Sequence, residues 1–380
     1  MSFWPLNDNH FTLLDKLKLS KFILVNDRWT QGENVLKFEA QMADYVGSKY
    51  AIFTSSGSTA NTMLAMYISD KFNNIENIIL PSTTWATSVF PFIREGLKPH
   101  FVDIRKNRFD IDYNQVRLIL RKNRSNNFLL FPTSLLGFNV DIIQLKKIES
   151  EFDNVKIFVD NCEATSGTWD NKNISSQFTS TTSTYLGHFL NSIEGGFIFT
   201  NDLEESEYFK MCRNHGMVRH SAKYYSKDEL IEDNNFRFDE IGSNFRNTEF
   251  NALAGLLDFR RLERHNDHRR QIYDYIFNKL NNNFIRPNYV SSQDVPFCLP
   301  ILSEKAEIIK RLKLLLGNLG VEFRPIVGGN MLRHKCLRKF ADYKEYPNSE
   351  FIVNNGLYIG LHNKVSFKMV DFLCEKINSL

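Results

Sequence analysis

The sequence predicts an α/β fold in which a mostly parallel sheet is covered by helices, followed by a smaller α+β domain. Between residues 50 and 159, short apolar runs alternate with helical stretches of about ten residues, as in sheets covered on both faces. The 380 residues exceed the length of about 250 to 300 at which chains usually split into domains. We therefore expect a large domain over 1–250, a connecting helix over 251–280 and a small domain over 281–380.

The elements of the large domain follow from the spacing of apolar residues. After a short polar lead, residues 34–45 predict an amphipathic helix, because Val35, Phe38, Met42 and Tyr45 share one side. Apolar runs predict strands at 50–54, 77–80, 100–104, 128–131 and 155–159. The stretches between them predict helices at 59–68, 84–94, 113–121 and 142–152.

The second part begins with a long helical pattern. Residues 247–280 contain no proline and no pair of glycines, which predicts one long helix or two nearly continuous ones. Beyond it, strands are expected at 295–302, 321–327 and 357–361. Helices are expected at 305–319 and at the end of the chain near Leu380.

Composition and charge exclude several classes of function. A net charge of +3, with basic residues spread along the chain, argues against nucleic acid as a partner. The sequence has no apolar run of membrane-spanning length and no signal peptide, so we expect a cytoplasmic protein. Its five cysteines are far apart and its histidines follow no zinc pattern, so we expect reduced thiols, no metal and no iron–sulfur cluster.

A candidate phosphate site lies between the first strand and the next helix. Residues 54–61 read Thr-Ser-Ser-Gly-Ser-Thr-Ala-Asn. A turn that contains glycine and leads into a helix supplies backbone N–H groups and a favourable dipole for a phosphate. The alternative is an ordinary Ser/Thr helix cap with a turn glycine.

Two further residues follow predicted strands at the edge of the sheet where open α/β folds bind ligands. Trp85 could stack on a pyridine ring, although a lone tryptophan is more often part of a core. Asp160 ends an apolar strand and could keep a pyridinium nitrogen protonated. The alternative for Asp160 is a helix-capping aspartate.

Residues 183–196 read Ser-Thr-Tyr-Leu-Gly-His-Phe-Leu-Asn-Ser-Ile-Glu-Gly-Gly. This segment resembles the Ser-Phe-x-x-x-Lys-x-(Leu/Ile)-x-x-x-Glu-Gly-Gly motif of the nucleotide-sugar aminotransferase family, whose lysine binds pyridoxal phosphate covalently. His188 stands at the lysine position, and no lysine lies between Lys172 and Lys210. Alone, His188 could be a hydrogen-bonded histidine beside a turn. The phosphate turn, the aromatic residue, the acid and this segment follow one another in the same order as in the family. The resemblance therefore covers nearly the whole chain.

The resemblance implies a fold-type I pyridoxal-phosphate enzyme that works as a homodimer with shared active sites. The residues at cofactor-binding positions of the family are Gly57, Ser58, Trp85, Asp160, Glu163, Ser183 and Asn244. Asn244 lies in a Gly-x-Asn-x-Arg turn, which in the family reaches the partner's cofactor phosphate. The residues at positions implied to bind substrate are His215, Arg219, Arg246 and Arg324.

With histidine instead of lysine at position 188, the chain resembles the 3-dehydratase branch of the family, typified by GDP-4-keto-6-deoxymannose 3-dehydratase. This implies a lyase in which glutamate converts pyridoxal phosphate into pyridoxamine phosphate. The enzyme would then remove the C3 hydroxyl of a nucleotide-linked 4-keto-6-deoxy sugar, giving a dideoxysugar for O-antigen or capsule. His188 would be the catalytic base. Phe189 stands where the branch often has a second histidine.

Three alternatives to the dehydratase remain. One is a sugar 4-aminotransferase, which His188 disfavours, and another is a related iron–sulfur 3-dehydrase that takes electrons from a reductase. The third is a catalytically dead cofactor-binding regulator. The sequence leaves open whether the nucleotide is GDP, which we favour, or CDP, and whether the sugar is a hexose or a heptose.

Overall fold

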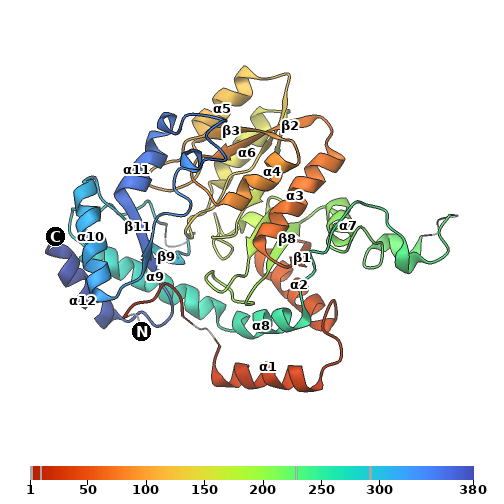
Figure 1. Cartoon of the computed structure of the whole chain (residues 1–380), viewed down its shortest axis with the longest axis horizontal. Helices are drawn as coiled ribbons and strands as arrows, with labels where there is room; N and C mark the ends of the chain where they lie inside the picture. Colours follow the sequence, from red (N-terminus) through yellow and green to blue (C-terminus); the bar gives the residue numbers. More distant parts are fainter. Residues whose placement is uncertain (1–2, 9–10, 227, 229, 291–292) are drawn as a thin grey trace.

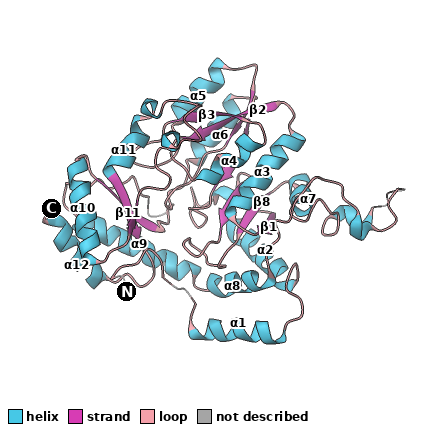
Figure 2. Ribbon diagram, in the orientation of Figure 1, coloured by secondary structure: helices cyan, strands magenta, loops and turns pink. Residues whose placement is uncertain are grey.

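A computed structural model describes residues 3–8, 11–226, 228, 230–290 and 293–380. Figure 1 shows a large domain around a central sheet and, at the left, a small domain with β9, β11, α10 and α12. Figure 2 shows strands inside both parts and helices around them. No helix in these described ranges is long and apolar enough to cross a membrane.

The large domain is built on two four-stranded sheets that share a continuous stretch of chain. The first is wholly parallel and has the order β3 (Lys98–Val102), β2 (Ile75–Pro81), β4 (Asn127–Leu130) and β5 (Val155–Ile157). The second has the order β1 (Tyr50–Thr54), β8 (Gly196–Thr200), β7 (Ser180–Ser183) and β6 (Val159–Asp160). Only Phe158 separates β5 from β6, so the two sheets continue each other, and within them only β8 runs antiparallel to its neighbours. The predicted mostly parallel sheet is confirmed.

Helices cover both faces of this sheet, as the alternation along β4 shows. Phe128 and Leu130 pack into one apolar cluster with α5 (Tyr113–Lys122) and α6 (Ile142–Glu151). Leu129 belongs to the cluster that contains α3 (Gly57–Lys71). The other helices of this domain are α2 (Glu33–Val46), α4 (Phe90–Arg94) and α7 (Leu203–Cys212). Both faces of β4 are therefore buried, which explains its continuous apolar run.

The small domain packs helices on a three-stranded antiparallel sheet. The strand order is β10 (Phe323–Arg324), β11 (Gly356–Gly360) and β9 (Cys298–Leu302). Its helices are α10 (Ala306–Leu319), α11 (Pro347–Asn355) and α12 (Phe367–Asn378), and α9 (Leu262–Lys279) packs against α12. They share one apolar cluster with Trp4, from the other end of the chain.

The structure differs from the sequence-based expectation in the helical region before α2. The expectation of only a short polar lead before the first helix was wrong. The helix α1 (Leu13–Val25) lies there and begins with a capping box at Thr12. Leu19 and Phe22 are buried while Leu13 and Leu14 are exposed, so α1 carries no clear apolar stripe. The long helical pattern forms two helices, α8 (Glu249–Phe259) and α9, which is one of the two expected forms.

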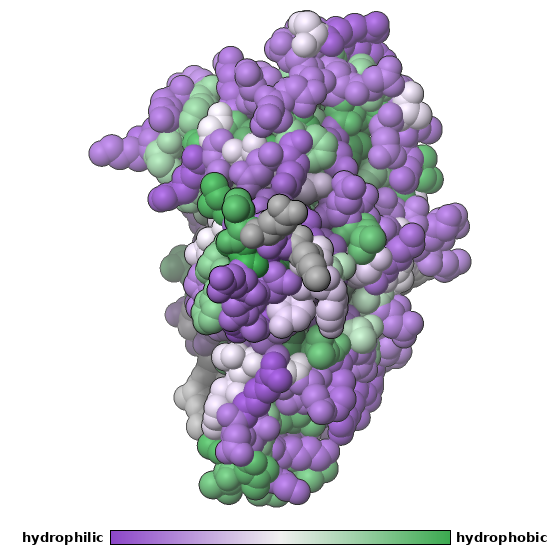
Figure 3. Space-filling view, turned by 90° about the vertical axis from the view of Figure 1, so that its right-hand side faces the viewer, coloured by the Kyte–Doolittle hydropathy of each residue, from purple (hydrophilic) through white to green (hydrophobic). Residues whose placement is uncertain are grey.

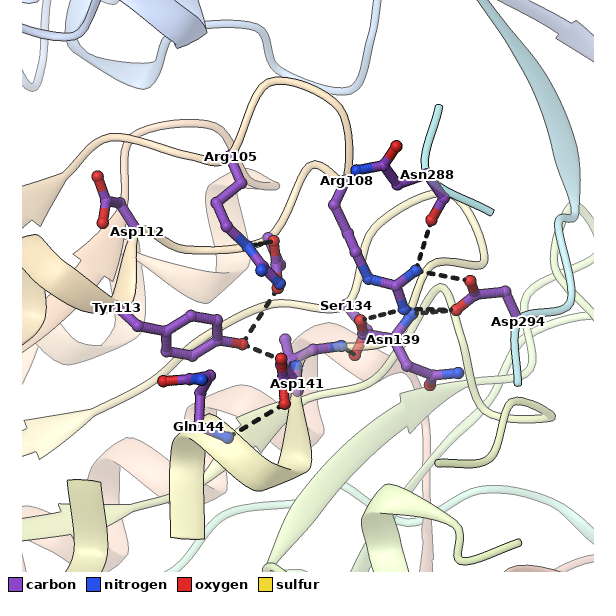
Figure 4. A network of polar contacts seen from close by, with 12 residues as sticks. Arg105, Arg108, Asp112, Tyr113, Ser134, Asn139, Asp141, Gln144, Asn288 and Asp294 are labelled. Carbon is purple, nitrogen blue, oxygen red and sulfur yellow. Dashed lines mark hydrogen bonds and ion pairs between the residues drawn. The ribbon is translucent and has the colours of Figure 1, made fainter. Parts of the chain in front are cut away.

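A buried ion pair fastens the segment before β9 to the large domain (Figure 4). Arg108 donates from Nη1 to Oδ2 of Asp294 at 2.8 Å and from Nη2 to Oδ1 at 2.9 Å, and both side chains are almost fully buried. Asp294 also accepts the backbone N–H groups of Asn139 at 3.0 Å and Val290 at 2.9 Å. This network fixes the segment that carries Phe297 into the cavity described below.

Replacing Asp294 by asparagine should destabilise the protein by about 3 kcal/mol, because the buried Arg108 guanidinium would lose its countercharge. Urea unfolding measures this as a lower midpoint at an unchanged slope. Glu149→Gln is the matched control, since it breaks only the exposed pair with Lys146 at 3.1 Å. We expect the control to change stability by about 0.5 kcal/mol or less. Similar losses in the two variants would contradict the importance of the buried pair.

Candidate active site

A cavity of about 390 Å³ opens where β6 and β7 end, between α3 and the start of β9. This volume lies within the range of about 300 to 1,000 Å³ typical of small-molecule sites. Seven of the residues singled out from the sequence line it, namely Gly57, Ser58, Trp85, Asp160, Glu163, Ser183 and His188. They come from separate stretches of the chain, and the fold brings them together.

The N-terminal end of α3 forms one wall of the cavity. Ser56 caps the helix by accepting the Thr59 N–H at 3.1 Å, and the Thr59 hydroxyl accepts the Ser56 N–H at 3.0 Å. The N–H groups of Gly57 and Ser58 belong to the first turn, where a helix has no acceptors of its own for them. A helix N-terminus with such N–H groups attracts anions. This end of the cavity is therefore suited to a phosphate.

Glycines let the chain pass closely around this turn. A Cβ atom at Gly57 would lie 2.9 Å from Sγ of Cys162 and 2.9 Å from Cβ of Ser183, which is too close. A Cβ at Gly196, where β8 begins, would overlap the backbone nitrogen of Gly57. One at Gly195 would overlap the Thr184 hydroxyl. The Gly-Gly pair after Glu194 is thus needed for β8 to pack against the phosphate turn.

Asp160 presents a buried carboxylate held by three donors. Its Oδ2 accepts the Asn61 amide at 2.9 Å and the Ser88 hydroxyl at 2.7 Å, and its Oδ1 accepts the Cys162 N–H at 3.1 Å. The Asn61 amide is oriented in turn by the Thr181 hydroxyl at 2.7 Å. The carboxylate is therefore rigidly placed, and it can accept a hydrogen bond from a protonated ring nitrogen in the cavity.

His188 lies in the cavity wall between two aromatic rings. Its ring centroid is 5.5 Å from that of Phe297 and 5.9 Å from that of Tyr185, both in edge-on geometry. Its buried Nδ1 has no hydrogen-bond partner among the described residues. Burial lowers the pKa of His188 to about 4, although the Ser183 carbonyl and the Asp160 charge oppose this shift. The imidazole is therefore neutral at pH 7 and can accept a proton.

Three more predicted residues complete the polar part of the cavity. Glu163 accepts the Leu136 N–H at 2.9 Å, and burial, together with the Asp160 charge, raises its pKa to about 7. The Ser183 hydroxyl accepts the Tyr185 N–H at 3.3 Å. Trp85 keeps 56% of its surface exposed, so its ring is free to contact a ligand.

The remaining predicted residues lie outside this cavity within a single chain. His215, Arg219 and Asn244 are exposed, and Asn244 pairs with Asn214 in an isolated antiparallel bridge. The Arg246 guanidinium donates to the side chain of Asn214. Arg324 is exposed on β10, opposite a residue of β11 that does line the cavity, Tyr358.

Sequence reasoning missed several residues of the cavity wall, among them Leu6, Asn7, Phe297, Cys298 and Tyr358. None carries a motif, because each reaches the cavity through packing of distant parts of the chain.

Phe189 does not line this cavity. It is buried, with its ring centroid 5.9 Å from that of Phe297 and 5.3 Å from the guanidinium of Arg269. Phe189 therefore supports the aromatic wall behind His188.

Comparisons with known proteins agree with this geometry. A model of the DegT/DnrJ/EryC1/StrS aminotransferase family matches residues 15–378. A GDP-4-keto-6-deoxy-D-mannose 3-dehydratase of Yersinia pseudotuberculosis is 32% identical over 364 residues, which cover 90% of this chain and 89% of that protein. The structure of an Escherichia coli GDP-4-keto-6-deoxy-D-mannose-3-dehydratase with bound hydrated pyridoxal phosphate is similar, with a TM-score of 0.90, 28% identity, and coverage of 99% of this chain and 100% of that one.

A further structure of GDP-4-keto-6-deoxymannose-3-dehydratase holds a trapped adduct of pyridoxal phosphate and glutamate. It matches with a TM-score of 0.90 and 28% identity, and covers 98% of this chain and 100% of that one.

Proposed function

We propose a specific activity for this chain, which belongs to the DegT/DnrJ/EryC1/StrS aminotransferase family. The protein is a pyridoxal-phosphate-dependent 3-dehydratase that removes the C3 hydroxyl of a nucleotide-linked 4-keto-6-deoxy sugar. The observation that carries the proposal is His188 in the wall of a cavity that has a phosphate turn and a buried carboxylate. Among the described residues of that wall there is no lysine. An imidazole can move a proton but cannot hold an aldehyde covalently.

The cavity fits the cofactor at three points. The N–H groups of Gly57 and Ser58 would bind its phosphate, Asp160 would accept the ring N–H, and Trp85 would stack on the ring. When bound, the cofactor supplies an electron sink that lets the C3 hydroxyl leave. Glu163 and Ser183 line the same cavity and would contact the polar edge of the ring.

His188 would move the proton at the C4′ carbon of the cofactor, with glutamate as amino donor. Because the imidazole is neutral at pH 7, it is ready to accept this proton. With no lysine beside C4′ to complete an amine transfer, loss of the hydroxyl is favoured over transamination. In sum, glutamate and the 4-keto sugar give 2-oxoglutarate, ammonia and the 4-keto-3,6-dideoxy sugar, a building block of surface polysaccharides.

GDP is the favoured nucleotide, because the similar relative and structures bear the name of a GDP-sugar enzyme. The diphosphate would bind a basic cluster that we define as Arg28, Arg219, His220 and Arg246. Arg213 lies beside this cluster, but its buried guanidinium is already paired with Glu39 and donates to the Phe53 carbonyl. Burial, together with the positive charges of Arg213, Arg219, Arg28 and Arg246, lowers the pKa of His220 to about 4. His215 and Arg324 would contact the substrate at the edges of the site. The proposal places the enzyme in the cytoplasm, with its nucleotide-sugar substrate.

The basic cluster and Asn244 would serve the cavity of a second copy in a homodimer. Apolar side chains gather on two exposed segments that such an assembly would cover. One is α1, at the lower end of Figure 3, where Leu13, Leu14 and Leu17 are exposed. The other is an arm whose described residues are 222–226, 228 and 230–241. It extends to the right in Figure 1 and exposes Leu230 and Ile241. Exposed apolar patches of this kind mark protein interfaces.

Complementation between two inactive variants tests the shared site. Asn244→Ala should weaken cofactor binding in the partner's cavity, and His188→Asn should inactivate its own cavity. In a mixed dimer, the Asn244→Ala chain keeps its own His188 and receives Asn244 from its partner. Mixing the two variants should therefore restore roughly a quarter of wild-type activity after random exchange of subunits. A fully active monomer on dilution, or a mixture without activity after exchange, would contradict the shared site.

The activity itself is tested with glutamate and 4-keto-6-deoxy sugars linked to GDP or to CDP. We expect 2-oxoglutarate and ammonia to form together during repeated turnover. This turnover should occur only when a sugar is present. A need for an added reductase would favour the iron–sulfur type of dehydrase. No 2-oxoglutarate with any sugar would favour a cofactor-binding regulator.

A further inference from the structure

The first described residues of the chain, 3–8, form a strap along the small domain (Figure 1). Its anchor is Trp4, which is fully buried and donates from its indole nitrogen to the Gly360 carbonyl at 2.8 Å. The backbone of Trp4 donates to Gly320 at 3.3 Å and accepts the Glu322 N–H at 2.9 Å. Trp4 thereby forms an isolated parallel β-bridge with Val321 of the small domain. These contacts fix where the strap begins.

Contacts on both sides of Asn7 hold the strap in place beyond this anchor. The Leu6 N–H donates to the Glu322 carboxylate at 3.1 Å, and Asp8 pairs with Lys364 at 2.7 Å. The Leu6 backbone passes so close to Gly360 that a Cβ there would lie 2.7 Å from the Leu6 Cα atom. The position of Asn7 is therefore set by the small domain.

Asn7 reaches the cavity beside the residue that precedes His188. A Cβ atom at Gly187 would lie 2.9 Å from Nδ2 of Asn7, so the amide rests against this part of the large domain. Leu6 and Asn7 both line the cavity. The Asn7 side chain is exposed at the cavity, so its amide offers both a donor and an acceptor to a ligand.

We infer that Asn7 is a specificity-determining residue, whose amide hydrogen-bonds a hydroxyl group of the sugar beside His188. A neutral amide matches a sugar hydroxyl, which also donates and accepts, better than it matches the charged phosphates. The strap thereby adds a sugar contact from the small domain to a cavity built mainly by the large one. This inference rests on the proposed function for the sugar class and goes beyond it in naming the residue.

Calorimetric binding of GDP and of GDP-mannose, a stable GDP-sugar, tests this inference on the full-length protein with bound cofactor. Asn7→Ala should weaken the binding of GDP-mannose about 10-fold, which is the effect of one hydrogen bond, and leave the binding of GDP unchanged. Trp4→Phe, which loses the indole N–H but keeps an aromatic ring, should weaken GDP-mannose in the same selective way. Asn283→Ala, in an exposed turn between α9 and β9, is the matched control and should change neither.

Two outcomes would overturn the assignment of Asn7 alone, provided that urea midpoints show the variants to be folded. One is an equal loss for GDP and GDP-mannose, and the other is no loss for either. If the wild-type protein bound neither GDP-mannose nor a GDP-linked 4-keto sugar, the proposed function would fail together with the inference. The KM of turnover gives a second readout, because loss of a sugar contact made throughout the reaction should raise KM and leave kcat unchanged.

Discussion

Replacing His188 by asparagine should lower turnover about 10²- to 10⁴-fold, the usual contribution of a general base. The loss should appear in both half-reactions, with glutamate and with the sugar, because both require movement of the C4′ proton. Asparagine keeps similar size and polarity in the wall formed with Phe297 and Tyr185, so cofactor and sugar should still bind. Single-turnover kinetics of each half-reaction, together with binding measurements, check this.

His215 is the competing candidate for the base, and deuterium exchange separates the two. In one chain, His215 is exposed and does not line the cavity, whereas His188 does. Exchange at C4′ of bound pyridoxamine phosphate should therefore disappear in His188→Asn and persist in His215→Asn. The reverse pattern would transfer the role to His215.

The purified protein should lose its cofactor on dialysis, and borohydride should fix none of it to the chain. The physical reason is that, in the proposed function, His188 takes the place of the lysine that would bind the aldehyde, and the described wall of the cavity offers no lysine instead. His188→Lys should reverse the result, giving a cofactor that borohydride attaches to residue 188 and a weaker dehydration activity. Mass spectrometry of digested protein measures both.

The control for this experiment is the wild-type protein treated with borohydride under the same conditions. A phosphopyridoxyl group on any lysine of the wild-type chain would contradict a cofactor held only by non-covalent contacts.

Most strands predicted from the sequence are apolar runs that the fold buries. β8 is an exception, because its sequence Gly-Phe-Ile-Phe-Thr is buried throughout but no strand was predicted there. The run at 50–54 coincides with β1, because its apolar residues end at a turn. β7 has the opposite character, since its sequence is Ser-Thr-Thr-Ser and gives no apolar signal. It lies in the core because distant partners satisfy its hydroxyl groups, as Asn61 does for Thr181 at 2.7 Å. Such partners are not visible in a local pattern.

The candidate site was predictable where its residues follow predicted strands, as Gly57, Trp85 and Asp160 do. It was not predictable where the wall depends on contacts between distant segments. Trp4 and Gly360 lie at opposite ends of the chain, and their hydrogen bond brings Asn7 to the cavity. The proposed role of Asn244 requires a second chain, so it stays a prediction.

The most direct test of the dehydratase assignment is the mass of the sugar product, measured with the ammonia released. The purified protein would be incubated with pyridoxal phosphate, glutamate and GDP-4-keto-6-deoxymannose. We expect a GDP-sugar that is one oxygen atom lighter than the substrate, with ammonia and 2-oxoglutarate in equal amounts. A GDP-linked 4-amino sugar formed without release of ammonia would contradict the assignment and identify an aminotransferase.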